Sequence, residues 1–175
     1  MELSFPADAV VVVTGVPGAG KTTLIRRAVD RDAARVVDTD DRREAGGRRL
    51  LYLGHYARIV AAVATRRPVV IHSRGTHPAA RRAIAALAAL RGRPAHLVML
   101  DAARSEAEAG QRERGRTVEP AEMDRQLARW RRLMARGPGG EGWASVVALD
   151  RSQAACVGAF VFRSAVQATP AAATI

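Results

Sequence analysis

A glycine-rich turn stands between an apolar run and an amphipathic segment, and it limits the folds open to this chain. Residues 11–25 read VVVTGVPGAGKTTLI, and the turn from Gly15 to Thr22 matches G-x-x-x-x-G-K-[ST] at every fixed position. Glycines let successive backbone N–H groups face phosphates, and the amino terminus of a following helix adds its positive end. The stretch therefore predicts a strand, a phosphate-binding loop and a helix from about Lys21 to Arg31. The residues expected to contact nucleotide are Gly15, Val16, Pro17, Gly18, Ala19, Gly20, Lys21, Thr22 and Thr23.

Two side chains of this turn carry the expected chemistry. Lys21 is the only lysine among 28 basic residues, and a slim, mobile ammonium suits a pair of phosphates better than the planar fork of arginine. We expect Lys21 to act as a catalytic residue that reaches the β- and γ-phosphates of ATP, and the Thr22 hydroxyl to ligand Mg²⁺. The alternative is a glycine-rich turn that binds no nucleotide.

Apolar runs alternate with helical patterns along the rest of the chain. Because the apolar runs are hydrophobic throughout, they predict a parallel sheet covered on both faces. We expect one α/β domain over residues 1–165, with five parallel strands, helices on both faces, and a disordered tail at 166–175. A stripe of Met123, Leu127, Trp130 and Met134 at helical spacing indicates core packing. The expected strands are 9–13, 34–38, 68–73, 94–101 and 143–150, and the expected helices are 21–31, 49–65, 77–92, a polar helix that runs into 111–116, and one from Pro120.

Composition narrows the classes of protein further. The single cysteine, Cys156, excludes a disulfide framework and by default reads as a small buried residue. The amino-terminal residues lack the pattern of a signal peptide and no apolar run could span a bilayer, so we expect a soluble, cytoplasmic protein without a membrane partner. The net charge of +11 permits nucleic-acid binding. Arginines scattered over solvated helix faces are the favoured reading, because aromatic residues for base stacking are scarce.

An acidic turn, VVDTDDRR at residues 36–43, follows the second expected strand. Asp38, Asp40 and Asp41 would lie at the carboxyl edge of the sheet, where open parallel sheets bind ligands. A carboxylate there can accept the proton of an attacking alcohol or orient Mg²⁺ through water. The alternative is that these residues cap the next helix. No second lysine is present to form the base-reading motif of a conventional GTPase.

The loop GVPGAGKTT together with D-x-D-x-x-R resembles the small P-loop kinases over about residues 9–155. That group includes adenylylsulfate kinase, shikimate kinase, gluconate kinase, the kinase part of polynucleotide kinase, and the zeta toxins. The resemblance implies a three-layer P-loop NTPase fold, with Asp40 as the base toward the acceptor hydroxyl and Arg43 holding an anionic group of the acceptor. Asp38 would lie nearer the metal. The acceptor pocket would be formed by segment 42–74, which includes His55. Its residues do not identify a substrate.

The third expected strand departs from that group. Relatives often place an aspartate at its end, whereas this chain reads His72-Ser73-Arg74-Gly75-Thr76. Ser73 could hold the metal through water. His72 and Arg74 are candidates for contact with substrate, although His72 also fits a buried structural histidine. Thr76 could instead cap the helix that follows.

Residues 111–119, QRERGRTVE, lie where these kinases carry a mobile lid. The resemblance implies that Arg112 and Arg116 clamp ATP and the transferring phosphoryl group, with Gly115 as a hinge. The alternative is that these arginines are solvated at a helix end. Arg151 lies where relatives wrap the adenine, so it is a further candidate for nucleotide binding.

Three functional hypotheses follow. The first is an ATP- and Mg²⁺-dependent kinase that phosphorylates a hydroxyl of a small molecule. The second is a polynucleotide 5′-hydroxyl kinase, and the third is a nucleotide-binding regulatory ATPase that acts through a partner. The sequence identifies neither the acceptor molecule nor the oligomeric state of the protein.

Overall fold

The computed structural model describes residues 1–38, 48–73, 76–113, 115 and 118–164, with the backbone alone for residues 48–53. Apolar and amphipathic segments alternate along these residues, so strands and helices alternate as well. The elements in chain order are β1 (Glu2–Pro6), β2 (Val10–Gly15), α1 (Lys21–Ala28), β3 (Arg35–Val37), α2 (Arg48–Val63), β4 (Val69–His72), α3 (Pro78–Leu90), β5 (Ala95–Leu100), α4 (Arg104–Arg112), α5 (Pro120–Arg136), β6 (Ser145–Leu149), α6 (Arg151–Cys156) and β7 (Ala159–Arg163).

The main sheet has five parallel strands in the order β3-β4-β2-β5-β6. Its central strand, β2, is buried along its whole length, and Val12 pairs with Ile71 on one side and Leu97 on the other. Strands buried on both faces are apolar throughout, which explains the uninterrupted valine run. The predicted five-stranded parallel sheet is therefore confirmed.

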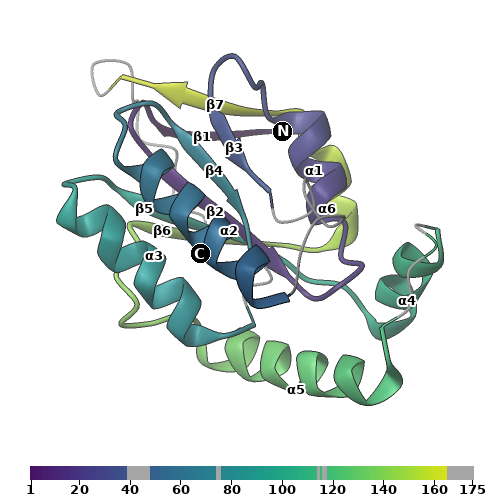
Figure 1. The fold of residues 1–175 in the computed structure, drawn as a ribbon. Helices are drawn as coiled ribbons and strands as arrows, with labels where there is room; N and C mark the ends of the chain where they lie inside the picture. Colours follow the sequence, from purple (N-terminus) through teal and green to yellow (C-terminus); the bar gives the residue numbers. More distant parts are fainter. Residues whose placement is uncertain (39–47, 74–75, 114, 116–117, 165–175) are drawn as a thin grey trace.

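Helices cover both faces of this sheet (Figure 1). α1 and α6 lie on one face, while α2 and α3 lie on the other (Figure 1). The chain passes from β2 outward to β3 and then returns across the sheet through β4 to β5 and β6. Right-handed crossovers in opposite directions place their helices on opposite faces. The predicted three-layer α/β fold is confirmed, and the loop after β2 lies at the carboxyl edge where the chain changes direction.

Three elements, β1, α6 and β7, were not predicted from the sequence. β1 pairs in parallel with β7 to form a separate two-stranded sheet, and Phe5 of β1 packs against Phe160 and His96. The pairing joins opposite ends of the chain, so no local pattern reports it. α6 has only six residues, and its cap residue is Asp150, whose side chain accepts a hydrogen bond from the Gln153 N–H at 2.7 Å.

Several boundaries and local roles differ from the prediction. α1 ends at Ala28, before the predicted Arg31, because Val29 is extended and the Asp30 side chain accepts a hydrogen bond from the Asp32 N–H. The cap of α3 is His77, so the alternative in which Thr76 caps this helix is wrong. Thr76 instead donates to Gln126 Oε1 of α5 at 2.5 Å.

The predicted apolar stripe of α5 is confirmed as core. Met123, Leu127 and Trp130 are buried, and Met134 is half-buried against the same core. Trp130 also donates its indole N–H to Asp101 Oδ1 at 2.8 Å, since a buried indole needs an acceptor. Cys156 is exposed at the end of α6, so its expected burial is wrong.

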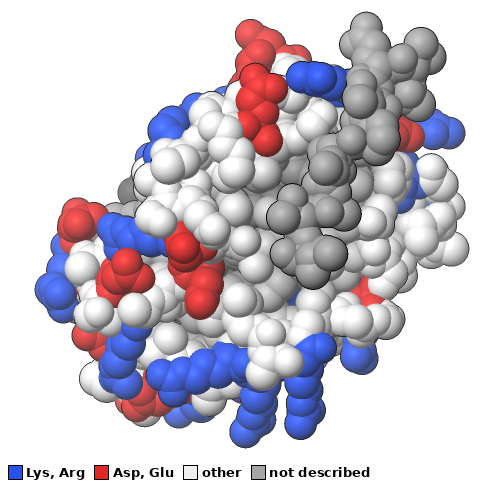
Figure 2. Space-filling view, turned by 180° about the vertical axis from the view of Figure 1, so that it is seen from behind, with Lys and Arg blue, Asp and Glu red and all other residues white. Residues whose placement is uncertain are grey.

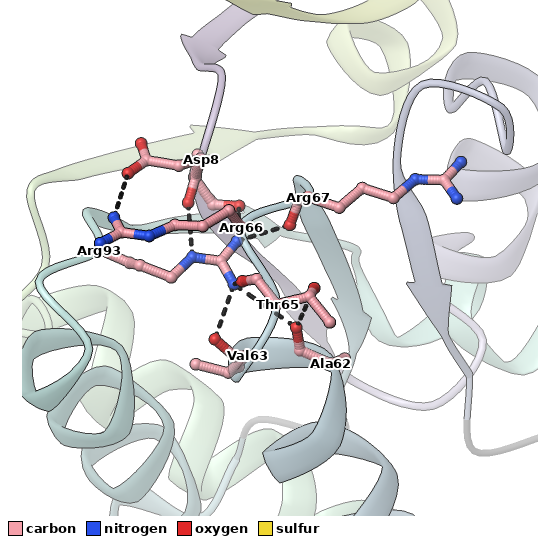
Figure 3. Close-up of polar contacts among 8 residues, drawn as sticks. Asp8, Ala62, Val63, Thr65, Arg66, Arg67 and Arg93 are labelled. Atoms are coloured by element: carbon pink, nitrogen blue, oxygen red, sulfur yellow. Dashed lines mark hydrogen bonds and ion pairs between the residues drawn. The ribbon is translucent and has the colours of Figure 1, made fainter.

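A buried arginine ties the other edge of the sheet together. Arg93, only 4% exposed, precedes β5 and directs its guanidinium at backbone carbonyls from three segments (Figure 3). It donates to Asp8 O at 2.7 Å, to Val63 O at 2.8 Å and to Arg67 O at 2.7 Å. Burial lowers the pKa of Arg93. These bonds join the start of β2, the end of α2 and the start of β4, away from the glycine-rich turn.

The charges are mixed over the face that Figure 2 shows, where acidic and basic side chains alternate and basic ones gather along its lower edge. On this face the basic side chains do not form one continuous surface (Figure 2). Among the described residues, none of the helices has the length and apolar character needed to cross a membrane.

Candidate functional site

The glycine-rich loop joins the end of β2 to the start of α1. Gly18 and Gly20 have φ angles of 86° and 90°, a left-handed conformation that side chains disfavour. Gly18 also lacks space, because a Cβ there would lie 1.9 Å from the carbonyl oxygen of Ala107 in α4. The loop therefore needs glycine at this position both for its conformation and for its contact with α4.

The amino terminus of α1 faces the loop without a side-chain cap. Its cap residue is Gly20, which has no side chain to accept a hydrogen bond from the first turn. Uncapped N–H groups at a helix start form an anion-binding position, aided by the helix dipole. The backbone geometry thus fits the phosphates that the sequence predicts.

Lys21 folds back over the loop to which it belongs. Its Nζ donates to Gly15 O and to Val16 O, both at 2.8 Å, and its side chain is buried. This ammonium is thereby held beside the N–H groups of the loop. Phosphate oxygens can replace these carbonyl acceptors when a nucleotide binds.

Thr22 carries a buried hydroxyl that has no hydrogen-bond partner among the described residues. Within the described part of the chain, its Oγ1 is one of four such buried side-chain atoms; the others are Thr14 Oγ1, His55 Nδ1 and His96 Nε2. A buried polar group without a partner costs free energy, which a ligand can recover. A hydroxyl oxygen at the start of α1 fits Mg²⁺, which prefers oxygen ligands and binds together with phosphates.

The carboxyl ends of β3 and β4 bring together Asp38 and His72. Asp38 Oδ1 and His72 Nδ1 lie 2.5 Å apart, and both side chains are buried. The sequence assigned Asp38 to the metal and His72 to the substrate but did not pair them. These two residues are 34 positions apart in sequence, and they meet because β3 lies next to β4 in the sheet. Their predicted ligand contacts stay predictions.

A second histidine belongs to this region. His55 of α2 is buried, and α2 packs against β3 and β4. Its pKa is lowered to about 4, first by burial and then by the electrostatic effects of Arg58 and His72, while Asp38 opposes the shift. His55 is therefore neutral near pH 7.

α4 is fastened to the phosphate loop by side chains whose role was not predicted. Gln111 Nε2 donates to Pro17 O at 3.4 Å, while Gln111 Oε1 accepts from the Val118 N–H at 2.8 Å. Gly110 packs so closely that a Cβ would lie 2.5 Å from Gly18 O. The sequence showed only a polar helix here, and no local signal marks these long-range contacts.

The structure describes only some of the remaining predicted site residues. Arg112 is exposed at the end of α4. Arg151 Nη1 donates to the carbonyl oxygen of Glu106 in α4 at 3.0 Å, and its predicted adenine contact stays a prediction. Four predicted residues lie outside the described part of the chain, and so their roles stay predictions as well: Asp40, Arg43, Arg74 and Arg116.

Comparison with known proteins agrees with the fold described above. The family described as AAA domain matches residues 10–136. The fold is similar to a gluconokinase from Sinorhizobium meliloti 1021, with a TM-score of 0.60, 22% identity, and coverage of 85% of this chain and 86% of that one.

Two further solved structures share the fold. A structure of the PezAT toxin–antitoxin system of Streptococcus pneumoniae has a TM-score of 0.60 at 12% identity and covers 87% of this chain and 71% of that one. Kti12 of Chaetomium thermophilum, solved with ADP-AlF3, has a TM-score of 0.52 at 19% identity and covers 85% and 94%. No curated protein matches the sequence. At these identities the likeness shows the fold alone.

Proposed function

Because the chain belongs to the AAA domain family, which matches residues 10–136, we propose that it is an ATP- and Mg²⁺-dependent phosphotransferase. In this proposal the γ-phosphate moves to a hydroxyl group of a small molecule. The observation that carries the proposal is the loop between β2 and α1. A buried lysine folds over this loop, and a buried threonine hydroxyl at its end has no partner among the described residues.

Each part of the loop would have a separate task. The N–H groups at the start of α1 would bind phosphate oxygens, and the ammonium of Lys21 would neutralise charge on the β- and γ-phosphates. The Thr22 hydroxyl would hold Mg²⁺, which when bound draws charge from the phosphate oxygens. The acidic end of β3 would face the acceptor, with Asp40 as the proposed base and Asp38 fixed by His72.

A regulatory ATPase is the second candidate. The end of β4 carries His72, paired with Asp38, where the small P-loop kinases that the motifs resemble often have an aspartate. Kti12, which shares the fold, was solved with ADP-AlF3. In this reading the chain would bind and slowly hydrolyse ATP and would act through a partner rather than on an acceptor.

The deciding experiment measures ADP release from Mg-ATP in the presence of separate acceptors. The acceptors are polyols, sugar acids, hydroxyl-bearing antibiotics and a 5′-hydroxyl oligonucleotide, the last of which tests the polynucleotide kinase hypothesis. Lys21→Ala removes the phosphate-binding ammonium. Arg26→Ala removes one exposed positive charge from the same helix and serves as the matched control.

Acceptor-dependent ADP release that Lys21→Ala abolishes and Arg26→Ala retains is the expected result. An oligonucleotide acceptor whose binding weakens steeply with salt would replace the small-molecule proposal by the polynucleotide kinase. Slow ADP release unchanged by every acceptor would favour the regulatory ATPase.

A further inference from the structure

His55 presents an unsatisfied polar atom inside the protein. The side chain is 7% exposed, and in the described part of the chain its Nδ1 has no hydrogen-bond partner. A buried nitrogen in this state destabilises the fold relative to an apolar side chain of similar size. A histidine at this position therefore lowers the stability of the fold, which is typical of residues that bind a ligand.

The surroundings of His55 restrict the kind of ligand. With a pKa lowered to about 4, His55 is a neutral imidazole near pH 7 and offers one hydrogen bond without a charge. The carboxyl group of Asp38 acts on the same position and disfavours an anionic group. No group of three or more potential metal-binding side chains was found among the described residues.

The position of His55 relates it to the predicted acceptor region. α2 packs against β3 and β4, whose carboxyl ends carry Asp38 and His72. The neighbouring Tyr56 contacts the His55 ring edge-on, with centroids 5.8 Å apart, and is 42% exposed. His55 therefore contacts a partly exposed aromatic side chain, and its helix packs on the two strands that end at the buried Asp38–His72 pair.

We propose that His55 Nδ1 binds a hydroxyl group of an uncharged polyol portion of the acceptor. A hydroxyl can both donate and accept, so it matches a neutral imidazole in either tautomer. This inference rests on the proposed function, because it assigns a binding contact to the acceptor of the same phosphotransfer. It adds a specificity-determining residue on α2 to a site otherwise built from strand ends and the phosphate loop.

The test uses D-sorbitol as the polyol probe on the full chain with Mg²⁺ and a non-hydrolysable ATP analogue. Imidazole nitrogen resonances are followed by NMR at pH 7 during a sorbitol titration. We expect a saturable shift of the His55 Nδ1 resonance and no shift of the exposed His77, the internal control. His55→Leu removes the nitrogen, and His55→Asn keeps a polar atom near the same place; for both, the His72 resonance reports binding.

We expect His55→Leu to weaken sorbitol binding by about tenfold or more, and His55→Asn to stay within about threefold of the unaltered chain. The unfolding midpoint of His55→Leu should be unchanged or higher, because an unsatisfied polar atom is removed. A His55 resonance that sorbitol leaves unmoved, equal binding by His55→Leu, or a lowered midpoint for that variant would each overturn the inference.

This result can be separated from the fate of the proposed function. Sorbitol binding at His55 without acceptor-dependent ADP release would retain the contact and reject the kinase. Acceptor-dependent ADP release that is unaffected by His55→Leu would retain the kinase and reject the contact.

Discussion

We expect the site to require a narrow cationic side chain at Lys21. Its Nζ reaches two carbonyls of its own loop, each at 2.8 Å, from a buried position. We expect Lys21→Arg to lower ATP turnover by about 100-fold or more, because a guanidinium is too wide to take the same place although it keeps the charge. The measurement is the rate of ADP release at saturating acceptor.

The matched control is Arg26→Lys, the reverse exchange at an exposed position of the same helix. It should leave the rate unchanged. Equal turnover by Lys21→Arg and the unaltered chain would show that charge alone is needed at this position.

Thr22 differs from Lys21, because its buried hydroxyl has no hydrogen-bond partner among the described residues. Thr22→Val replaces the hydroxyl by a methyl group of similar size, so the free energy of unfolding should stay equal or rise by about 1 kcal/mol. Affinity for ADP should fall at least about tenfold with Mg²⁺ present and change little in EDTA. Calorimetric titration with and without EDTA measures both, and an equal loss in the two conditions would remove Thr22 from the metal site.

At the scale of elements, the phosphate loop and α4 form one packed unit. Gly18 and Gly110 allow their backbones to approach, and Gln111 bonds to the loop at Pro17 O. The loop therefore takes its shape from α4 as well as from its own glycines. Gln111 and Pro17, which are far apart in sequence, are thereby held next to each other.

We expect Gly110→Ala to weaken ATP binding and to lower the free energy of unfolding by about 1–3 kcal/mol, since its Cβ would lie 2.5 Å from Gly18 O. Gly54→Ala in α2 is the matched control, because its Cβ would meet nothing within 4 Å. That change should stabilise the helix by up to about 1 kcal/mol. Denaturant unfolding and ATP titration of both variants decide the matter, and equal stabilisation by the two would contradict the close packing of α4 on the loop.

At the scale of the whole molecule, Arg93 holds the edge of the sheet away from the phosphate loop. It satisfies carbonyls from three segments and has no carboxylate hydrogen-bonded to it among the described residues (Figure 3). We expect Arg93→Lys to lower the free energy of unfolding by about 2–3 kcal/mol, because one ammonium cannot reach all these acceptors. Affinity for ATP should be unchanged, since the loop lies at the other edge.

Urea unfolding measures this loss, with Arg91→Lys at a nearby exposed position as the control. Similar unfolding free energies for the two variants would mean that the buried carbonyls do not depend on the fork of Arg93.

The sequence determined the repeating architecture and the phosphate loop, because both depend on local patterns. Apolar strands alternate with amphipathic helices, and the glycine, lysine and threonine positions lie within eight residues of one another. Such local patterns can be recognised in the sequence before the fold is known. The same locality explains why the α5 stripe around Trp130 was confirmed.

Only the tertiary structure decided the contacts between distant segments. The pairing of β1 with β7, of Asp38 with His72, and of Gln111 with the phosphate loop each joins parts of the chain that share no local pattern. The segment containing His55 was expected to face the acceptor, but its unpartnered nitrogen became visible only in the folded chain. Hydrogen bonding and burial depend on three-dimensional neighbours, whereas strand and helix patterns depend on neighbours along the chain.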